Sequence, residues 1–396
     1  MKVTTFGEIL ELQRGFDLPA SEMINGDVPV AGSNGVIGYH NVAKVQPPCI
    51  TVGRSGSVGK VHYYNEPIWA HNTSLFVSDF KGNNRKYIYY LLKSKDFAKL
   101  CDSSVVPSLN RNFVYPIKTL FEENKDKQQK IATVLSSLDD KIALNRSMNA
   151  KLEQMAKRLY DHWFVQFDFP NADSKPYKAS GGKMVWNETL KREIPAGWEV
   201  KSVNDISISY RGVGYSADDE KSVNDKDVVL ILRGNNISNN HIVYDSNTVY
   251  LDKSFVSEEQ KIHKYDFVMT MSSGSKEHVG KSAMFLFDSP HSYGAFCNKI
   301  TPNKECQFFL ENYLHSEFFK KYIKVTCSGT GINNLTNEHF DKALFAFPTE
   351  NLLKSFNKKV GPIYEQVGVL EQEIQKLTAL RNRLLPLLMN GQVEVR

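Results

Sequence analysis

At 396 residues, the chain is long enough for two or three domains that each bury a core of their own. Its composition, 41% hydrophobic and 23% charged, is typical of a globular protein, and a net charge of +5 permits nucleic acid as a partner without requiring it. The densest apolar run, residues 384–389, is far shorter than the ~18 residues of a membrane span, and the chain does not begin like a secretion signal. The five cysteines are scattered without a C-x-x-C pair, so we expect a cytoplasmic protein with reduced thiols, no metal site and no membrane attachment.

The chain is predicted to use one plan twice, a globular domain followed by a long helix. The stretch before Ile194 is rich in turn-forming residues, including Pro170, Pro176 and Gly181, and is typical of a linker. We expect a first domain over residues 1–120, a long helix over 123–164, a linker over 165–193, a second domain over 194–348 and a second long helix over 350–390.

The two predicted helices repeat each other. Residues 131–142 align with residues 363–374 without a gap at an offset of 232, and apolar residues follow steps of four and three, which is coiled-coil spacing. Asn145, Asn149 and Arg381 interrupt this seam, where buried polar groups cost stability but can fix the register. Two unrelated amphipathic helices would rarely match so closely, so we interpret the match as an internal duplication. The expected helix-pairing seam consists of Ile131, Leu135, Leu138, Ile142, Leu152, Ile363, Val367, Leu370, Ile374, Leu377 and Leu384.

The globular parts repeat more faintly. Residues 50–61 and 268–281 each hold a β-rich run, a Gly/Ser loop and a Val-Gly-Lys triplet. Near the end of each domain, a short aromatic helix (residues 87–100 or 308–325) precedes an Asn-containing turn (residues 107–113 or 331–336). The pattern indicates that each globular part holds a β-rich run and a short helix and that the two parts are distantly repeated.

The glycine loops do not satisfy the phosphate-binding motif G-x-x-x-x-G-K-[ST]. Five residues, not four, separate Gly53 from Gly59 and Gly274 from Gly280, and valine follows Lys60 in the first loop. His71 and His278 are isolated, and the methyltransferase motif Asn-Pro-Pro-Phe/Tyr is absent. We therefore expect no catalytic residues, with an NTPase built on these loops as one alternative.

The same loops suit nucleic acid. Glycine turns let the backbone approach phosphates, basic side chains neutralise them, and Asn side chains can read base edges. Asn and Gly also form turns without any ligand, so the pattern as a whole carries more weight than any one residue. A further alternative is a structural tether that binds only other proteins. The candidate DNA-binding residues are Asn34, Arg54, Ser55, Lys60, Asn110, Arg111, Asn112, Asn235, Asn236, Ser273, Lys276, Lys281, Asn333 and Asn334.

In its motifs and in its domain order, the chain closely resembles the specificity subunits of type I restriction–modification systems. The resemblance covers nearly the whole chain, and its motifs are moderately specific one by one and strongly so together with the duplication. The stretches that carry it are residues 29–41, 50–61, 106–112, 129–142, 194–199 and 383–391.

The resemblance implies an α+β fold in which two mixed α/β target-recognition domains are separated by two long helices, paired as an antiparallel coiled coil with pseudo-two-fold symmetry. It also implies double-stranded DNA as the ligand, each domain reading one half of a split site while the helices set the spacing. Two modification (methyltransferase) subunits and restriction subunits would assemble around the helices. The chain would bind no cofactor, with S-adenosylmethionine, ATP and Mg on the partner subunits. The DNA sequence recognised is left open.

Overall fold

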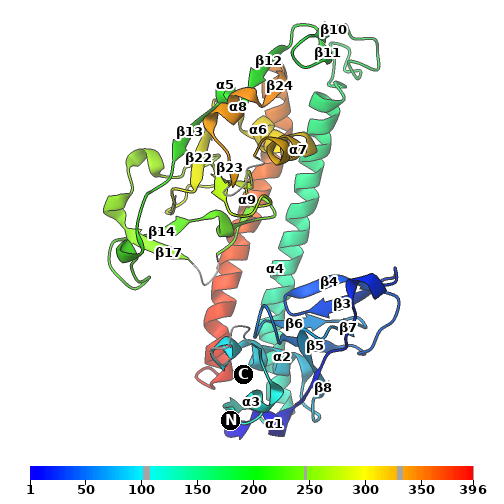
Figure 1. The fold of residues 1–396 in the computed structure, drawn as a ribbon, viewed down its shortest axis with the longest axis vertical. Helices are drawn as coiled ribbons and strands as arrows, with labels where there is room; N and C mark the ends of the chain where they lie inside the picture. The colour runs from blue at the N-terminus through cyan, green and yellow to red at the C-terminus, as the bar shows by residue number, and fades with distance from the viewer. Residues whose placement is uncertain (101–107, 245–247, 328–332, 396) are drawn as a thin grey trace. The chain divides into compact units, whose positions relative to one another are not determined.

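The computed structural model describes residues 1–100, 108–244, 248–327 and 333–395 (Figure 1). Val106, Pro107, Gly331 and Ile332, which belong to segments singled out above, lie outside these residues, as does Cys101, one of the five cysteines. The chain divides into two compact units, residues 1–145 with 373–396 (unit 1) and residues 146–372 (unit 2). Each long helix therefore contributes one part to each unit.

Unit 1 is built on two small sheets and a two-stranded ribbon. In the four-stranded sheet all neighbours are antiparallel, whereas the three-stranded sheet includes one parallel pair. The strand orders are β2(Glu11–Arg14)-β8(Ser74–Asp79)-β5(Cys49–Gly53)-β6(Val61–Tyr64), β4(Gly35–His40)-β3(Val28–Gly32)-β7(Trp69–Ala70) and β1(Lys2–Thr5)-β9(Lys118–Phe121). The short helices are α1(Phe6–Ile9), α2(Arg85–Lys93) and α3(Arg111–Val114).

The core of unit 1 includes the first turns of one long helix, α4 (Lys125–Tyr160), and the last turns of the other, α9 (Glu350–Met389). The side chain of Asn84 accepts a hydrogen bond from the Tyr87 amide and so caps α2, which buries one apolar face against the sheet. Buried in the same cluster are Ile131 and Leu135 from α4 and Leu385, Leu388 and Met389 from α9. The helices are thus part of the domain core rather than separate from it.

Unit 2 repeats the sheets of unit 1 strand for strand. Its strand orders are β13(Ser207–Arg211)-β22(Cys297–Pro302)-β18(Phe267–Thr270)-β20(Ser282–Met284), β17(Val249–Asp252)-β14(Val228–Leu232)-β21(Ser292–Tyr293) and β12(Glu199–Ser202)-β24(Leu344–Phe347). Two-residue strands form the pairs β15(Ile237–Ser238)-β16(His241–Ile242) and β19(Ser272–Ser273)-β23(Asn333–Asn334). Its helices are α5(Val203–Ile206), α6(Gln307–Leu314), α7(Glu317–Thr326) and α8(Asn337–Lys342). The expected internal duplication therefore extends through the globular parts.

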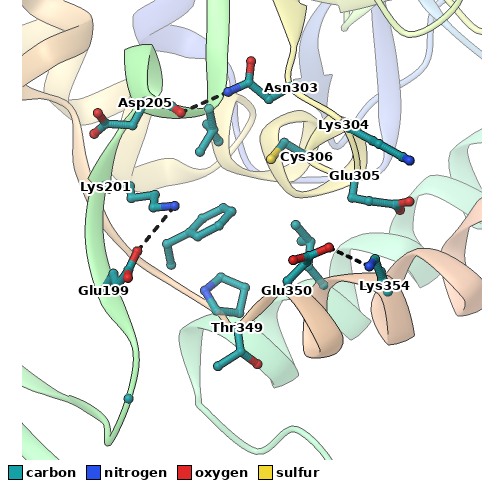
Figure 2. A pocket seen from close by; sticks show the side chains of 15 residues that line it. Glu199, Lys201, Asp205, Asn303, Lys304, Glu305, Cys306, Thr349, Glu350 and Lys354 are labelled. Carbon is teal, nitrogen blue, oxygen red and sulfur yellow. Dashed lines mark hydrogen bonds and ion pairs between the residues drawn. The ribbon is translucent and has the colours of Figure 1, made fainter.

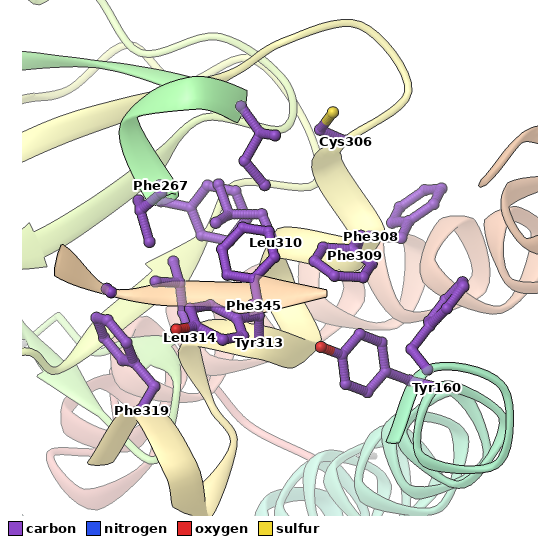
Figure 3. Packing of buried hydrophobic residues seen from close by; sticks show 14 of the residues in the cluster. Tyr160, Phe267, Cys306, Phe308, Phe309, Leu310, Tyr313, Leu314, Phe319 and Phe345 are labelled. Atoms are coloured by element: carbon purple, nitrogen blue, oxygen red, sulfur yellow. The ribbon is translucent and has the colours of Figure 1, made fainter. Parts of the chain in front are cut away.

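The core of unit 2 is aromatic around α6 (Figure 3). Tyr160 of α4 meets Phe309 of α6 edge-on with ring centroids 5.3 Å apart, and Phe309 in turn meets Phe345 of β24 at 5.3 Å. Phe356, on the first turns of α9, packs against Trp163 at 5.8 Å. Such pairs add specific geometry to the burial of large apolar surfaces, so α4 and α9 are again held within the core.

The expected linker is ordered. After α4 the chain makes one turn of π-helix, Asp161–Val165, and later the hairpin β10(Met184–Asn187)-β11(Arg192–Pro195). Phe169 stacks between Tyr177 and Trp198, with ring centroids 4.6 and 5.4 Å away. This aromatic stack ties the segment to the start of the second domain.

The long helices run antiparallel within each unit. In unit 1, Asp139, Lys141 and Asn145 of α4 contact α9, and the contacted residue moves back from Arg381 to Glu373 as α4 advances. In unit 2, Tyr160 near the end of α4 meets Phe356 near the start of α9. The expected fold class, α+β with an antiparallel helix pair and a duplicated plan, is confirmed.

The register of the duplication differs from the sequence alignment by one heptad. The helix starts Lys125 and Glu350 are 225 positions apart (350 minus 125), seven fewer than the expected 232. A matched pair of contacts supports this register: Tyr90 of α2 donates its hydroxyl to Asp139 at 2.8 Å, and Asn312 of α6 donates to the Tyr364 hydroxyl at 3.0 Å. Asp139 and Tyr364 are also 225 apart (364 minus 139). A heptad pattern matches itself after a shift of seven, so the spacing alone could not separate the two offsets.

The expected seam residues are buried to different degrees. Ile131, Leu135, Ile142, Val367 and Leu370 are buried, and Leu138, Leu152, Ile363, Ile374, Leu377 and Leu384 are half-buried. Asn145 and Asn149 are buried as well, and Nδ2 of Asn145 donates to Glu373 at 2.8 Å. Sequence reasoning missed the aromatic end of the stripe, formed by Tyr160, Trp163, Phe164, Phe356 and Tyr364.

Candidate nucleic-acid interface

In unit 1, four segments meet at the β5–β6 hairpin loop. The amides of Arg54 and Ser55 donate to the carbonyl of Thr73 at 2.8 and 3.2 Å, and the amide of Leu109 donates to the carbonyl of Arg54 at 2.8 Å. A Cβ on Gly53 would lie 2.9 Å from the carbonyl oxygen of Ser33, so the β3–β4 turn is also close. The loop, the β7–β8 turn, the β3–β4 turn and the segment after residue 108 thus form one cluster, here called loop cluster 1.

Unit 2 has the same arrangement, here called loop cluster 2. The amides of Met271 and Ser272 donate to the carbonyl of Phe296 at 2.8 and 3.2 Å, and the amide of Leu335 donates to the carbonyl of Met271 at 2.7 Å. A Cβ on Gly234 would lie 3.0 Å from Thr270, which places the turn after β14 beside the loop. The duplication therefore reaches individual backbone hydrogen bonds in the loops.

The Val-Gly-Lys triplets occupy equivalent positions, as the sequence predicts. Gly59 and Gly280 have φ angles of +80° and +79°, a conformation that favours glycine. Their amides donate to the carbonyls of Gly53 and Thr270 at 2.9 Å each. Gly53 therefore corresponds to Thr270 and not to Gly274, and the second loop is the longer of the two. The extra residues, among them Lys276, belong to unit 2 alone.

Most candidate DNA-binding residues belong to these clusters and are accessible. Nζ of Lys60 lies 2.7 Å from Oδ1 of Asn34, so these two side chains from different turns are brought together. Nζ of Lys281 lies 3.3 Å from Nδ1 of His278. Asn34, Lys60, Asn110, Arg111, Asn112, Asn235, Lys276 and Asn334 are exposed, and Arg54, Ser55, Ser273 and Lys281 are half-buried. The backbone of Asn333 pairs with Ser273.

Some of the candidates also have structural roles. Oδ1 of Asn110 accepts a hydrogen bond from the Asn112 amide at 3.0 Å and caps α3. Nη1 of Arg111 donates to the carbonyl of Leu12 at 3.1 Å. The side chains of Asn110 and Arg111 therefore stabilise the local backbone, whether or not they also contact DNA.

For Asn236 the structure contradicts the expectation of base reading. The residue is fully buried, with 0% of its surface exposed. Its Oδ1 accepts from the Arg233 amide at 2.9 Å, and its Nδ2 donates to the Val243 carbonyl at 3.0 Å. Both polar ends of the side chain are used within the domain, so its neighbour Asn235, which is exposed, is the better candidate.

The loop geometry argues against the NTPase alternative. A P-loop leads from a strand into a helix whose amides surround the phosphates. Lys60 and Lys281 instead lead directly into strands β6 and β20. Among the described residues, no group of three or more His, Cys, Asp and Glu side chains is arranged to hold a metal ion.

A cavity of 460 Å³ in unit 2 lies between β12, β24 and the start of α9 (Figure 2). Its charged side chains neutralise one another, since Nζ of Lys201 is 3.4 Å from Glu199 and Nζ of Lys354 is 2.6 Å from Glu350. Three lysines, including Lys304, thus face four carboxylates in the lining, so the cavity has no excess of positive charge to attract a phosphate backbone.

Two positions in the loop clusters escaped sequence reasoning, Thr73 and Phe296. They are equivalent, because each carbonyl accepts the two amides at the start of its hairpin loop. Nothing in the local sequence marks them, since the turns that hold them share no motif. Only the backbone hydrogen bonds bring them into the clusters.

Taken as a whole, the chain is a duplicated α+β protein with one polar and basic loop cluster on each unit and a long antiparallel helix pair. A family described as the type I restriction modification DNA specificity domain matches residues 1–154. In the described residues, no helix is both long and apolar enough to cross a membrane.

Known proteins support the same assignment. The type I restriction enzyme MjaIX specificity subunit of Methanocaldococcus jannaschii is 25% identical over 316 residues, 78% of this chain and 69% of that protein. The StySPI specificity subunit of Salmonella potsdam is 33% identical over 208 residues, 50% of this chain and 44% of that protein. The chain is thus similar to specificity subunits of type I restriction–modification systems, and its residues 1–154 match the DNA specificity domain of that family.

The fold has a solved counterpart. The crystal structure of a type I restriction–modification S subunit from M. genitalium superimposes with a TM-score of 0.57 at 17% sequence identity, covering 98% of this chain and 96% of that chain. At this identity, the likeness concerns the fold alone.

Proposed function

We propose that the chain is the sequence-specific DNA-binding subunit of its restriction–modification complex and that each loop cluster reads one half of a split DNA site. The observation that carries the proposal is the repetition of one backbone framework with different side chains. Loop cluster 1 presents Asn34 and Asn112, whereas loop cluster 2 presents Asn235 and Lys276 on a longer loop. A shared framework with unlike side chains suits two half-sites of different sequence.

In this proposal the helix pair sets the distance between the half-sites. α4 has 36 residues and α9 has 40, which at ~1.5 Å per residue gives helices of about 54 and 60 Å. Half-sites on one side of B-DNA lie about 34 Å, or one helical turn, apart. Helices of this length are long enough to impose such a spacing.

The proposed partners follow from the family. Two modification subunits dock on the helix pair, and restriction subunits join the complex in the cytoplasm. S-adenosylmethionine, ATP and Mg belong to those subunits, so this chain contributes recognition and spacing without binding a cofactor. Exposed apolar residues on the helices, such as Leu144, Met148 and Met155 on α4 and Leu380 on α9, fit a docking role.

The decisive experiment is to map methylated adenines in the DNA of cells that carry the whole system. We expect one motif made of two unlike half-sites separated by a spacer of fixed length. Deleting this chain while keeping the modification subunits should abolish the motif. Methylation that persists without the chain, or that shows no split motif, would contradict the proposal.

A binding measurement separates this function from that of a protein-only tether. The complex of this chain with its modification subunits should prefer duplexes carrying the mapped motif over scrambled duplexes. Its affinity should fall steeply with salt, because phosphate contacts release counterions. A tether that binds only proteins would show neither property.

A further inference from the structure

Phe296 is an exposed aromatic residue in loop cluster 2. It occupies the two-residue turn between Gly294 and strand β22, closed by a 2.8 Å hydrogen bond from the Cys297 amide to the Gly294 carbonyl. Its own carbonyl accepts the amides of Met271 and Ser272, so its backbone is fixed to the start of the hairpin loop. Yet 69% of its surface is exposed. A largely exposed ring on a turn held by backbone hydrogen bonds is accessible to a ligand outside the domain.

The equivalent turn in unit 1 is polar. It runs from His71 to Ser74 and is closed by the same type of bond, from the Ser74 amide to the His71 carbonyl at 2.9 Å. Thr73 takes the place of Phe296, is half-buried, and its Oγ1 lies 2.9 Å from Nδ1 of His71. The ring is therefore not needed to build this turn, since the same backbone forms with threonine.

The surroundings of Phe296 identify the kind of ligand. Its turn is bonded to the loop that carries Ser273, Lys276 and Lys281, and that loop pairs with the strand that ends at Asn334. In the described part of loop cluster 2, Phe296 is the large hydrophobic side chain that is exposed beside these basic residues, whereas protein-docking sites offer an extended apolar area. DNA-binding proteins place isolated apolar side chains against thymine methyl groups or between base steps.

We propose that Phe296 is a specificity-determining residue that makes an apolar contact with the bases of the half-site read by unit 2. This inference rests on the proposed function and refines it. Thr73 occupies the same position toward the other half-site, where a hydroxyl replaces the ring. The same turn thus occurs once in each unit, with threonine in one and phenylalanine in the other, and contributes to the difference between the half-sites.

The test uses the complex with its modification subunits and duplexes carrying the split motif mapped in wild-type cells. We compare Phe296→Ala and Phe296→Thr with Phe318→Ala, a matched control whose ring is 59% exposed on α7, outside the loop cluster. Phe296→Ala should weaken binding to the motif about tenfold or more, the cost of a lost base contact, and leave binding to a scrambled duplex unchanged. Phe318→Ala should bind like the wild type.

Methylation mapping in cells supplies an internal control. The Phe296→Ala and Phe296→Thr variants should relax or change one or two positions of a single half-site and leave the other half-site intact. Replacing each thymine of the affected half-site by deoxyuridine identifies a methyl contact, and increased 2-aminopurine fluorescence on binding identifies insertion between bases.

Three results would overturn the inference: an unchanged motif and affinity in Phe296→Ala, an equal loss of binding to motif and scrambled duplexes, or a failure of the variant to assemble with the modification subunits while still folded. If wild-type cells show no split motif at all, the proposed function fails instead. The two failures are therefore distinguishable.

Discussion

Nη1 of Arg381 lies 2.6 Å from Oδ1 of Asp139, which joins α9 to α4 inside unit 1. The sequence placed Arg381 in the seam, where an apolar residue would pack most simply. The structure explains the charge, because Asp139 is only 24% exposed and also accepts the hydroxyl of Tyr90 at 2.8 Å. Burial, together with the Asp139 carboxylate, raises the pKa of Tyr90 well above its usual range. The three side chains link both long helices to α2.

Removing Asp139 should destabilise unit 1. Asp139→Ala removes the carboxylate from Nη1 of Arg381 and from the Tyr90 hydroxyl in a mostly buried place, and among the described residues only Asn382 still accepts from the guanidinium. We therefore expect a loss of about 2–4 kcal/mol in the free energy of unfolding. Urea denaturation measures this. As a control, Glu350→Ala breaks an exposed pair with Lys354, which the solvent screens, and should cost far less than Asp139→Ala. Equal effects of the two variants would contradict the role assigned to Asp139.

Replacing Asn149 with leucine should stabilise the helix pair. Asn149 is only 2% exposed, and neither Oδ1 nor Nδ2 has a hydrogen-bond partner among the described residues. Removing an unsatisfied buried amide should raise the free energy of unfolding by about 1–3 kcal/mol. Thermal melting of Asn149→Leu tests this against Asn145→Leu, which loses the 2.8 Å bond to Glu373 and should gain less. A lower melting temperature for Asn149→Leu would contradict the prediction.

The stability of unit 2 should depend on the charge of His241. Glu153 of α4 and Glu371 of α9 approach its two ring nitrogens at 3.5 and 2.8 Å and raise its pKa to about 10. A raised folded-state pKa gives a contribution that is complete below the unfolded value near 6.5 and is lost as the pH rises to about 10. Urea midpoints measured from pH 6 to pH 10 should therefore fall more steeply for the wild type than for His241→Gln. Parallel curves for the two proteins would contradict this assignment.

Lys60 and Lys281 should contribute to DNA affinity through phosphates. Each stands at the end of a hairpin loop, Lys60 exposed and Lys281 half-buried. Substituting either lysine by alanine in the complex should reduce the magnitude of the slope of log K against log salt concentration by about 1. It should also weaken binding to cognate and scrambled duplexes to the same extent. Lys191→Ala, in the β10–β11 hairpin, is the control and should leave the slope unchanged. A loss restricted to the cognate duplex would instead assign the lysine to base reading.

Much of the architecture follows from the sequence. The steps of four and three over both helices determine the buried stripe, and the Val-Gly-Lys triplets mark equivalent positions because both glycines need a positive φ. The starts of the long helices were predicted at residues 123 and 350, and they lie at Lys125 and Glu350. These features depend on residues close together in the chain, so local patterns are sufficient to find them.

Within the candidate interface, the sequence found the loops but not every residue in them. Asn235 and Asn236 look alike in sequence, and only the packing decides that one is exposed and the other fully buried. Thr73 and Phe296 could not be matched, because their equivalence lies in hydrogen bonds to residues far away in the chain.

The duplicated helix and its seam were therefore determined by the sequence alone, because hydrophobic periodicity is a local property. The tertiary structure decided the register of the duplication, the burial of the helix ends in the domain cores and the membership of the loop clusters. A heptad pattern is unchanged by a shift of seven residues, so the offset of 225 had to come from contacts such as Tyr90–Asp139 and Asn312–Tyr364. Contacts between distant segments break that ambiguity, since each helix start is fixed by the strand and the core that precede it.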